Sequence, residues 1–95
     1  MRVTWSPRAR STRGAAIDYI ARDNLEAALS QLDAIQRQVR ILAEHPEIGR
    51  PGRVAGTREL VISRTPFILV YRVDGDAVRS LHFLHGAQQW PPASE

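Results

Sequence analysis

Three side chains in the last third of the chain have the chemistry that cleaving an RNA strand by its own 2′-hydroxyl requires. They are Glu59, Arg72 and His85. A carboxylate can act as base and an imidazole as acid, and a guanidinium can stabilise charge that develops on the phosphate. Side chains alternate between the two faces of each expected strand, and this alternation allows the three to lie close together on the sheet. The alternative is that Glu59 and Arg72 form an ion pair between strands and His85 is only a strand-end histidine.

Arginines and one tryptophan are candidates for binding a partner. All 13 basic residues are arginine, and the formal net charge is +3. The planar guanidinium binds phosphates and carboxylates, but this charge fits an acidic protein partner as well as nucleic acid. A GC-rich genome is the simpler explanation for the missing lysine, and a core position is the simpler expectation for the tryptophan. The candidate binding residues are Arg50, Arg53, Arg58, Arg64 and Trp90.

Spacing disfavours metal and phosphate-loop sites. His82 and His85 are three apart on an expected strand, so they point to opposite faces and cannot grip one ion. Gly49, Gly52 and Gly56 do not follow phosphate-loop spacing, and no lysine comes after them, so a flexible connector is expected. The chain has no cysteine, which excludes disulfides and thiolate metal ligands. No metal and no cofactor are expected.

The elements that must position these residues form one domain over residues 1–95. Ser6 followed by Pro7 is a helix-start signal. Asp23, with Glu26 three residues later, resembles a capping box at the start of a second helix. Apolar residues recur every three or four positions in both helices, so each has a side that can pack on a sheet. The expected bounds are 3–5 for a first strand, about 7–22 for the first helix and up to about 44 for the second.

Three more strands are expected after a loop over residues 46–57. The run from Phe67 to Tyr71 is apolar on both faces, which predicts a central strand. Gly75 sits between two aspartates and predicts a hairpin turn, because glycine adopts positive φ freely. The order is β-α-α-β-β-β, an α+β fold with a helical hairpin packed on an antiparallel sheet. The expected strands are 58–64, 67–73 and 77–85.

The chain contains no apolar run of about 18 residues, so no membrane span is expected. The first residues also lack the apolar stretch of a signal peptide. The expected location is the cytoplasm.

The order of elements and a set of short sequence words resemble the RelE/ParE superfamily of bacterial toxins, from type II toxin–antitoxin systems. The resemblance covers about residues 3–91. No single word is specific, but the set in this order is typical of the superfamily. The words are Ala43-Glu44-His45-Pro46, Gly49-Arg50-Pro51, Arg58-Glu59-Leu60, the strand 67–73 and Leu84-His85-Gly86-Ala87.

The resemblance implies one of two activities. RelE-like members are ribosome-dependent ribonucleases that cut mRNA, whereas ParE-like members poison DNA gyrase and lack the nuclease residues. Val61, Ile68 and Gln88 stand where the family nucleases carry basic residues, which favours the ParE-like branch. His85 lies close to the position of a histidine acid in some family nucleases. An mRNA interferase that uses Glu59, Arg72 and His85 therefore stays open as the alternative.

The resemblance also implies partners. The expected protein is a toxin neutralised by an antitoxin encoded beside it, through an extended and partly helical segment that wraps the toxin. An acidic antitoxin would complement the arginine-rich surface. DNA gyrase is the expected target, with the ribosome and mRNA as the alternative, and operator DNA is reached only through the antitoxin. A third possibility is a non-toxic partner that only forms the complex and binds operator DNA with it.

Overall fold

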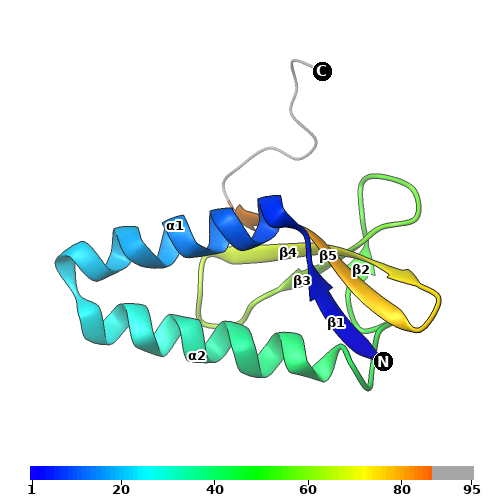
Figure 1. Cartoon of the computed structure of the whole chain (residues 1–95), viewed down its shortest axis with the longest axis horizontal. Coiled ribbons are helices and arrows are strands. Elements are labelled where there is room, and N and C mark those ends of the chain that lie inside the picture. Colours follow the sequence, from blue (N-terminus) through cyan, green and yellow to red (C-terminus); the bar gives the residue numbers. More distant parts are fainter. Residues whose placement is uncertain (87–95) are drawn as a thin grey trace, which may run out of the picture.

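The structure, a computed structural model, describes residues 1–86 (Figure 1). Two helices pack on a five-stranded sheet, which confirms the expected α+β class. Trp90 and Gln88 lie outside the described residues. The helices are α1 (Pro7–Asp23) and α2 (Leu25–Ile41); the strands are β1 (Arg2–Trp5), β2 (Arg50–Pro51), β3 (Arg58–Val61), β4 (Phe67–Asp74) and β5 (Ala77–His85), in the spatial order β1-β5-β4-β3-β2.

The sheet is mixed, which corrects the expectation of a wholly antiparallel one. β1 runs parallel to β5, with Val3 opposite Val78, while the other three pairings are antiparallel. A parallel pair needs a long crossover, and the helical hairpin with the strands after it supplies one. The two-residue β2 was expected to be loop. It adds an edge strand, with Arg50 opposite Glu59 and Pro51 opposite Arg58, and proline is tolerated at such an edge.

Side-chain caps fix the starts of both helices. Ser6 Oγ accepts the N–H of Ala9 at 3.0 Å ahead of Pro7, as predicted. The second cap is Asn24 and not Asp23, because Asn24 leaves helical geometry and its Oδ1 accepts the N–H of Ala27 at 3.0 Å. The helix α2 ends at Ile41, about three residues earlier than expected. The last turn tightens there through bonds such as that from the N–H of Leu42 to the carbonyl of Val39.

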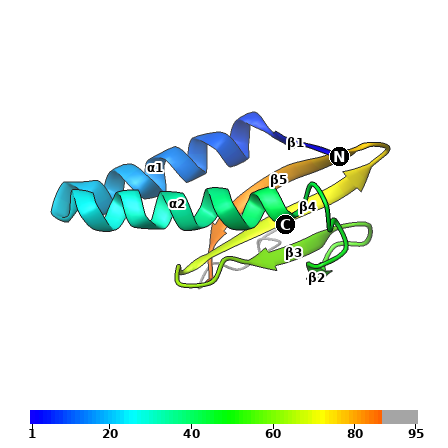
Figure 2. The ribbon, with the colours of Figure 1, turned by 90° about the horizontal axis from the view of Figure 1, so that it is seen from below.

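The core lies between the helical hairpin and one face of the sheet. Phe67, Leu69 and Tyr71 alternate along β4 and point toward the helices, and all three are buried. From the predicted apolar stripe, Ile35 and Val39 of α2 and Leu42 just after it belong to this core. Leu25, the first residue of α2, is instead 64% exposed. Figures 1 and 2 show the reason, since the tip of the hairpin extends past the sheet. From α1, the buried Ala9 belongs to the same core.

Within residues 1–86, neither helix has the length and apolar character that crossing a membrane requires.

Candidate functional site

Hydrogen bonds from neighbouring strands order the glycine-rich segment between α2 and β3, residues 46–57. The expected flexible connector is therefore a structured loop. The Tyr71 hydroxyl donates to the carbonyl of Pro46 at 2.7 Å and accepts the N–H of Gly49 at 2.9 Å. The guanidinium of Arg58 donates to the carbonyls of Glu47 at 3.1 Å and of Gly49 at 2.8 Å. Arg58, a candidate for binding a partner, thus serves the fold.

The chemistry of Tyr71 suits this structural role. Burial raises the pKa of its hydroxyl above the ordinary value, against smaller opposing effects of the Gly49 N–H and the Arg58 charge. The hydroxyl therefore keeps its proton and can donate to the loop. Gly49 is also required for space, because a Cβ there would lie only 2.5 Å from the Tyr71 hydroxyl oxygen.

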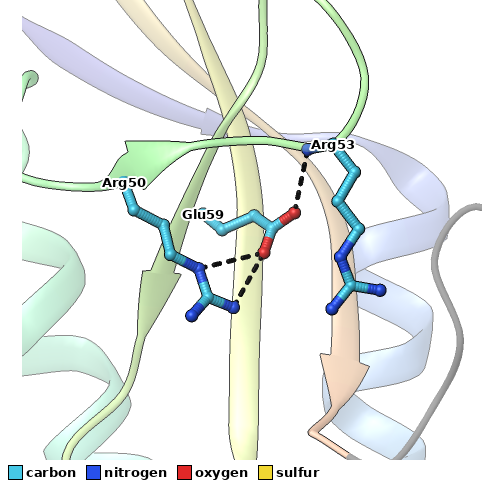
Figure 3. Close-up of polar contacts among 3 residues, drawn as sticks. All are labelled: Arg50, Arg53 and Glu59. Atoms are coloured by element: carbon cyan, nitrogen blue, oxygen red, sulfur yellow. Dashed lines mark hydrogen bonds and ion pairs between the residues drawn. The ribbon is translucent and has the colours of Figure 1, made fainter.

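Glu59 holds residues 50–53, which we call the outer half of the same loop (Figure 3). Its side chain is 4% exposed, and one carboxylate oxygen accepts two bonds from the guanidinium of Arg50, at 2.9 and 3.2 Å. The other oxygen accepts the backbone N–H of Arg53 at 3.3 Å. A buried carboxylate needs such partners, because an unpaired one is costly to bury. The ion pair predicted for Glu59 is present, but with Arg50 and not with Arg72.

The pairing of strands separates the three candidate catalytic residues. Glu59 lies opposite Val70, on the sheet face away from the helices, which we call the outer face. Arg72 is two residues farther along β4, so it shares that outer face. His85 instead pairs with Phe67 and meets its ring edge-on, with ring centroids 6.2 Å apart, on the helix-facing side. The structure thus brings Glu59 and Arg72 to one face and leaves His85 on the other.

Arg72 has a cation as its direct neighbour. It lies opposite Arg79 in the β4–β5 pairing, and like charges in that position destabilise a sheet. Arg79 donates to Asp74 at 3.2 Å, and both side chains are about half exposed. Among the described residues, no carboxylate pairs with Arg72. The outer face therefore carries exposed positive charge at this end of the sheet.

The remaining candidate arginines are exposed, and each has a backbone role. Arg53 places its N–H on Glu59, and its side chain extends from the loop across the outer face (Figure 3). Arg64 has a φ of 67°, left-handed geometry that suits the turn between β3 and β4. The strand β3 itself ends at Val61, before the expected residue 64. Trp90 is outside the described residues, so its predicted role stays a prediction.

The histidines do not assemble a metal site in the part of the chain that the structure describes, where no group of three potential ligands occurs. His82 is half-buried. Burial, and to a smaller extent the charge of Arg8, lower its pKa below the ordinary value. The imidazole is therefore mostly neutral near pH 7.

Sequence reasoning missed an apolar groove between the helical hairpin and the adjacent ends of β4 and β5. It encloses about 430 Å³. Tyr19, which is 69% exposed, lines it together with His85 and Phe67. The sequence signal was weak, because Tyr19 lies beside the apolar stripe of α1 and not on it. The other lining residues are Thr12, Ala15, Ala16, Ile20, Gln31, Pro66 and Phe83.

Three comparisons with known proteins agree on one family. Residues 3–90 match the family model described as "ParE toxin of type II toxin-antitoxin system, parDE". A curated protein of Sinorhizobium fredii, named "Putative toxin Y4kP", is 41% identical over 90 residues, which cover 95% of this chain and 93% of that protein. A solved structure titled "Chromosomal ParDE TA system from P. aeruginosa" has a TM-score of 0.80 and 30% identity, over 90% of this chain and 95% of its own.

Proposed function

The chain belongs to the ParE toxin family of type II toxin–antitoxin systems, and from this membership we propose that it stops growth by binding DNA gyrase, without turning over a substrate. A cognate antitoxin neutralises it by covering its surface. Operator DNA is reached only through that antitoxin. The toxin needs no cofactor for this mode of action.

The placement of the polar residues is the observation that supports binding over catalysis. A ribonuclease needs its base, its acid and a cation around one phosphate. Here Glu59 is buried and engaged by Arg50 and the N–H of Arg53, and His85 lies on the opposite side of the sheet. Arg50 and Arg58 bond to the protein itself. The candidates for an RNA-cleaving centre therefore do not surround one phosphate, because Glu59 stabilises the loop and His85 lies on the other side of the sheet.

The exposed arginines are the proposed contacts with the target. Arg53 and Arg64 reach solvent from the loop and from the turn after β3, and Arg72 reaches solvent from the outer face. Guanidinium groups at such positions accelerate encounter with an acidic surface and fix its orientation. We propose that they contact gyrase or gyrase-bound DNA.

Controlled induction of the chain in bacteria tests the proposal. Growth should stop, plasmid supercoiling should fall, and purified protein should inhibit gyrase supercoiling or trap its cleaved DNA. Co-expression of the protein encoded by the adjacent gene should restore growth. Gyrase activity that stays unchanged at saturating toxin would contradict the proposed target.

Mapping mRNA ends in the same cells separates the nuclease alternative. The binding mode predicts no new mRNA ends, and growth arrest that persists in the His85→Ala variant, because His85 is not one of the proposed contacts with gyrase. New ends that disappear in His85→Ala or in Arg72→Ala would instead identify a ribosome-dependent interferase.

A further inference from the structure

A second pocket lies at the open end of the helical hairpin, away from the apolar groove. The helices α1 and α2 diverge there, with β1 beside them (Figure 1). The pocket encloses about 500 Å³. We call it the Trp5–Arg13 pocket. Its main lining residues are Val3, Trp5, Arg13, Gln36, Val39 and Arg40.

The pocket contains cationic charge that the described part of the chain does not neutralise. The guanidinium carbon of Arg13 lies 4.3 Å from the centre of the Trp5 ring. Arg40 lines the same pocket from α2. Neither guanidinium forms an ion pair or hydrogen bond with any residue from 1 to 86. The cation–π contact fixes the position of Arg13 but leaves its N–H donors unused.

The surroundings of Arg13 make an anion favourable there. The side chain is half-buried, and burial together with the nearby charge of Arg10 lowers its pKa. Both effects mean that the folded chain holds this cation at a cost, because it is partly dehydrated and close to a like charge. A carboxylate beside Arg13 would relieve that cost and accept two parallel bonds from the guanidinium fork.

The walls of the pocket indicate which anion it fits. Val3, Trp5 and Val39 supply apolar surface next to the two arginines, and Gln36 adds an amide that can donate. A free phosphate is fully hydrated and would leave the apolar wall uncovered. An acidic side chain in a protein segment matches both parts, because its methylene groups cover the wall while its carboxylate reaches the arginines.

We propose that the Trp5–Arg13 pocket is the anchoring site for a glutamate or aspartate of the antitoxin. The proposal rests on the proposed neutralisation by an antitoxin and assigns the place where its acidic residue binds. It is a site of charge recognition, distinct from the apolar groove, with which it shares no lining residue.

Binding of the purified antitoxin to toxin variants tests this site. The probe is the protein encoded by the adjacent gene, and affinity is measured by titration calorimetry. Arg13→Ala should weaken binding at least about tenfold, because it leaves a carboxylate without its partner. Arg40→Ala, at an exposed position, should weaken it about two- to fivefold. Arg13→Lys should lose part of the affinity, since lysine keeps the charge but not the fork.

Arg22→Ala is the matched control. Arg22 is an exposed arginine in the last turn of α1 and lies outside the pocket lining, so its removal changes net charge equally and should leave affinity unchanged. Antitoxin variants with single Glu→Gln or Asp→Asn changes then locate the partner. If an antitoxin residue contacts Arg13, its variant should bind the Arg13→Ala toxin no more weakly than the wild-type antitoxin binds that toxin. Arg40→Ala does not disturb the Trp5 contact, so it keeps the test valid if Arg13→Ala unfolds.

The possible outcomes distinguish a failure of the proposed site from a failure of the proposed neutralisation. Wild-type affinity in both Arg13→Ala and Arg40→Ala would overturn the site while leaving neutralisation intact. An antitoxin that fails to bind the wild-type chain would overturn both the proposed site and the proposed neutralisation. Inorganic phosphate that shifts the Trp5 indole N–H resonance, and loses that effect in Arg13→Ala while antitoxin affinity stays unchanged, would show a site for another anion and would also overturn the proposal.

Discussion

The backbone N–H of Gly49 donates to the hydroxyl of Tyr71 at 2.9 Å and ties the glycine-rich loop to the central strand, β4. The same hydroxyl donates to Pro46 on the other side of the loop. A single side chain from β4 therefore satisfies one donor and one acceptor of a segment that has little secondary structure of its own. The loop in turn carries Arg53, one of the proposed contacts with the target.

Removing that hydroxyl should destabilise the protein. Tyr71→Phe keeps the ring but leaves the Gly49 N–H and the Pro46 carbonyl without their partner. The expected loss is about 1 to 3 kcal/mol in the free energy of unfolding, the cost of stranding buried polar groups. Urea unfolding measures it. Tyr19→Phe is the control, because Tyr19 is 69% exposed, and an equal loss in both variants would contradict the role of the buried hydroxyl.

Neutralising Glu59 should release the outer half of the loop. Glu59→Gln keeps the size of the side chain, but its amide donors then face the donors of Arg50. We expect a loss of about 1.5 to 3 kcal/mol, the range for hydrogen bonds to charged groups, and faster trypsin cleavage after Arg53. Asp33→Asn breaks an exposed pair with Arg37 and should cost less than about 0.5 kcal/mol. Unchanged cleavage after Arg53 would show that other contacts hold the loop.

The regular parts of the fold could be predicted because their signals are local or periodic. The hydroxyl cap at Ser6 and the positive φ of Gly75, observed at 61°, each follow from a few neighbouring residues. The central position of β4 follows from its two apolar faces. The choice between Asp23 and Asn24 as the second cap could not be predicted, because both side chains can cap and only the path of the chain decides.

The site was harder to predict because it depends on contacts between distant residues. Arg58 and Glu59 have the composition of a binding or catalytic site, yet their partners are carbonyls and an arginine of the preceding loop, which no periodicity indicates. Alternation predicted the faces of β3 and β4, but not of the whole of β5. An irregularity in the β4–β5 pairing shifts the alternation there, so Arg79 lies on the outer face while Phe83 is in the core. The face that each strand presents also depends on how it pairs with its neighbours. That pairing placed Glu59 and His85 on opposite sides of the sheet.

A buried hydroxyl on β5 leads to a prediction of the opposite sign, a gain in stability on its removal. Ser80 lies opposite Tyr71, next to an irregularity in the β4–β5 pairing, and is 0% exposed. Its Oγ has no hydrogen-bond partner among the described residues. Burying an unpartnered polar atom is unfavourable, so Ser80→Ala should stabilise the protein by up to about 1 kcal/mol. Urea unfolding checks the sign, and a loss of stability would mean that the hydroxyl has an acceptor.

Stability should also depend on pH through His82. Burial lowers the pKa of this imidazole in the folded chain below its ordinary value of 6.5. As the pH falls, the unfolded chain therefore takes up the proton before the folded chain does. The stabilising contribution is complete above that ordinary value and is lost as the pH falls through the folded pKa. The free energy of unfolding of the wild type should therefore decline between about pH 7 and about pH 5 more steeply than that of His82→Gln.

Urea titrations at several pH values across that window measure the difference in slope between wild type and His82→Gln. Subtracting the two curves removes the effect of the carboxylates, which both proteins share. His45→Gln is the control, since His45 is exposed just after α2 and the variant keeps His82, so it should follow the wild-type slope. Equal slopes for wild type and His82→Gln would mean that burial does not disfavour the charged imidazole, and that the half-buried position of His82 on β5 is open enough to water to hydrate a proton.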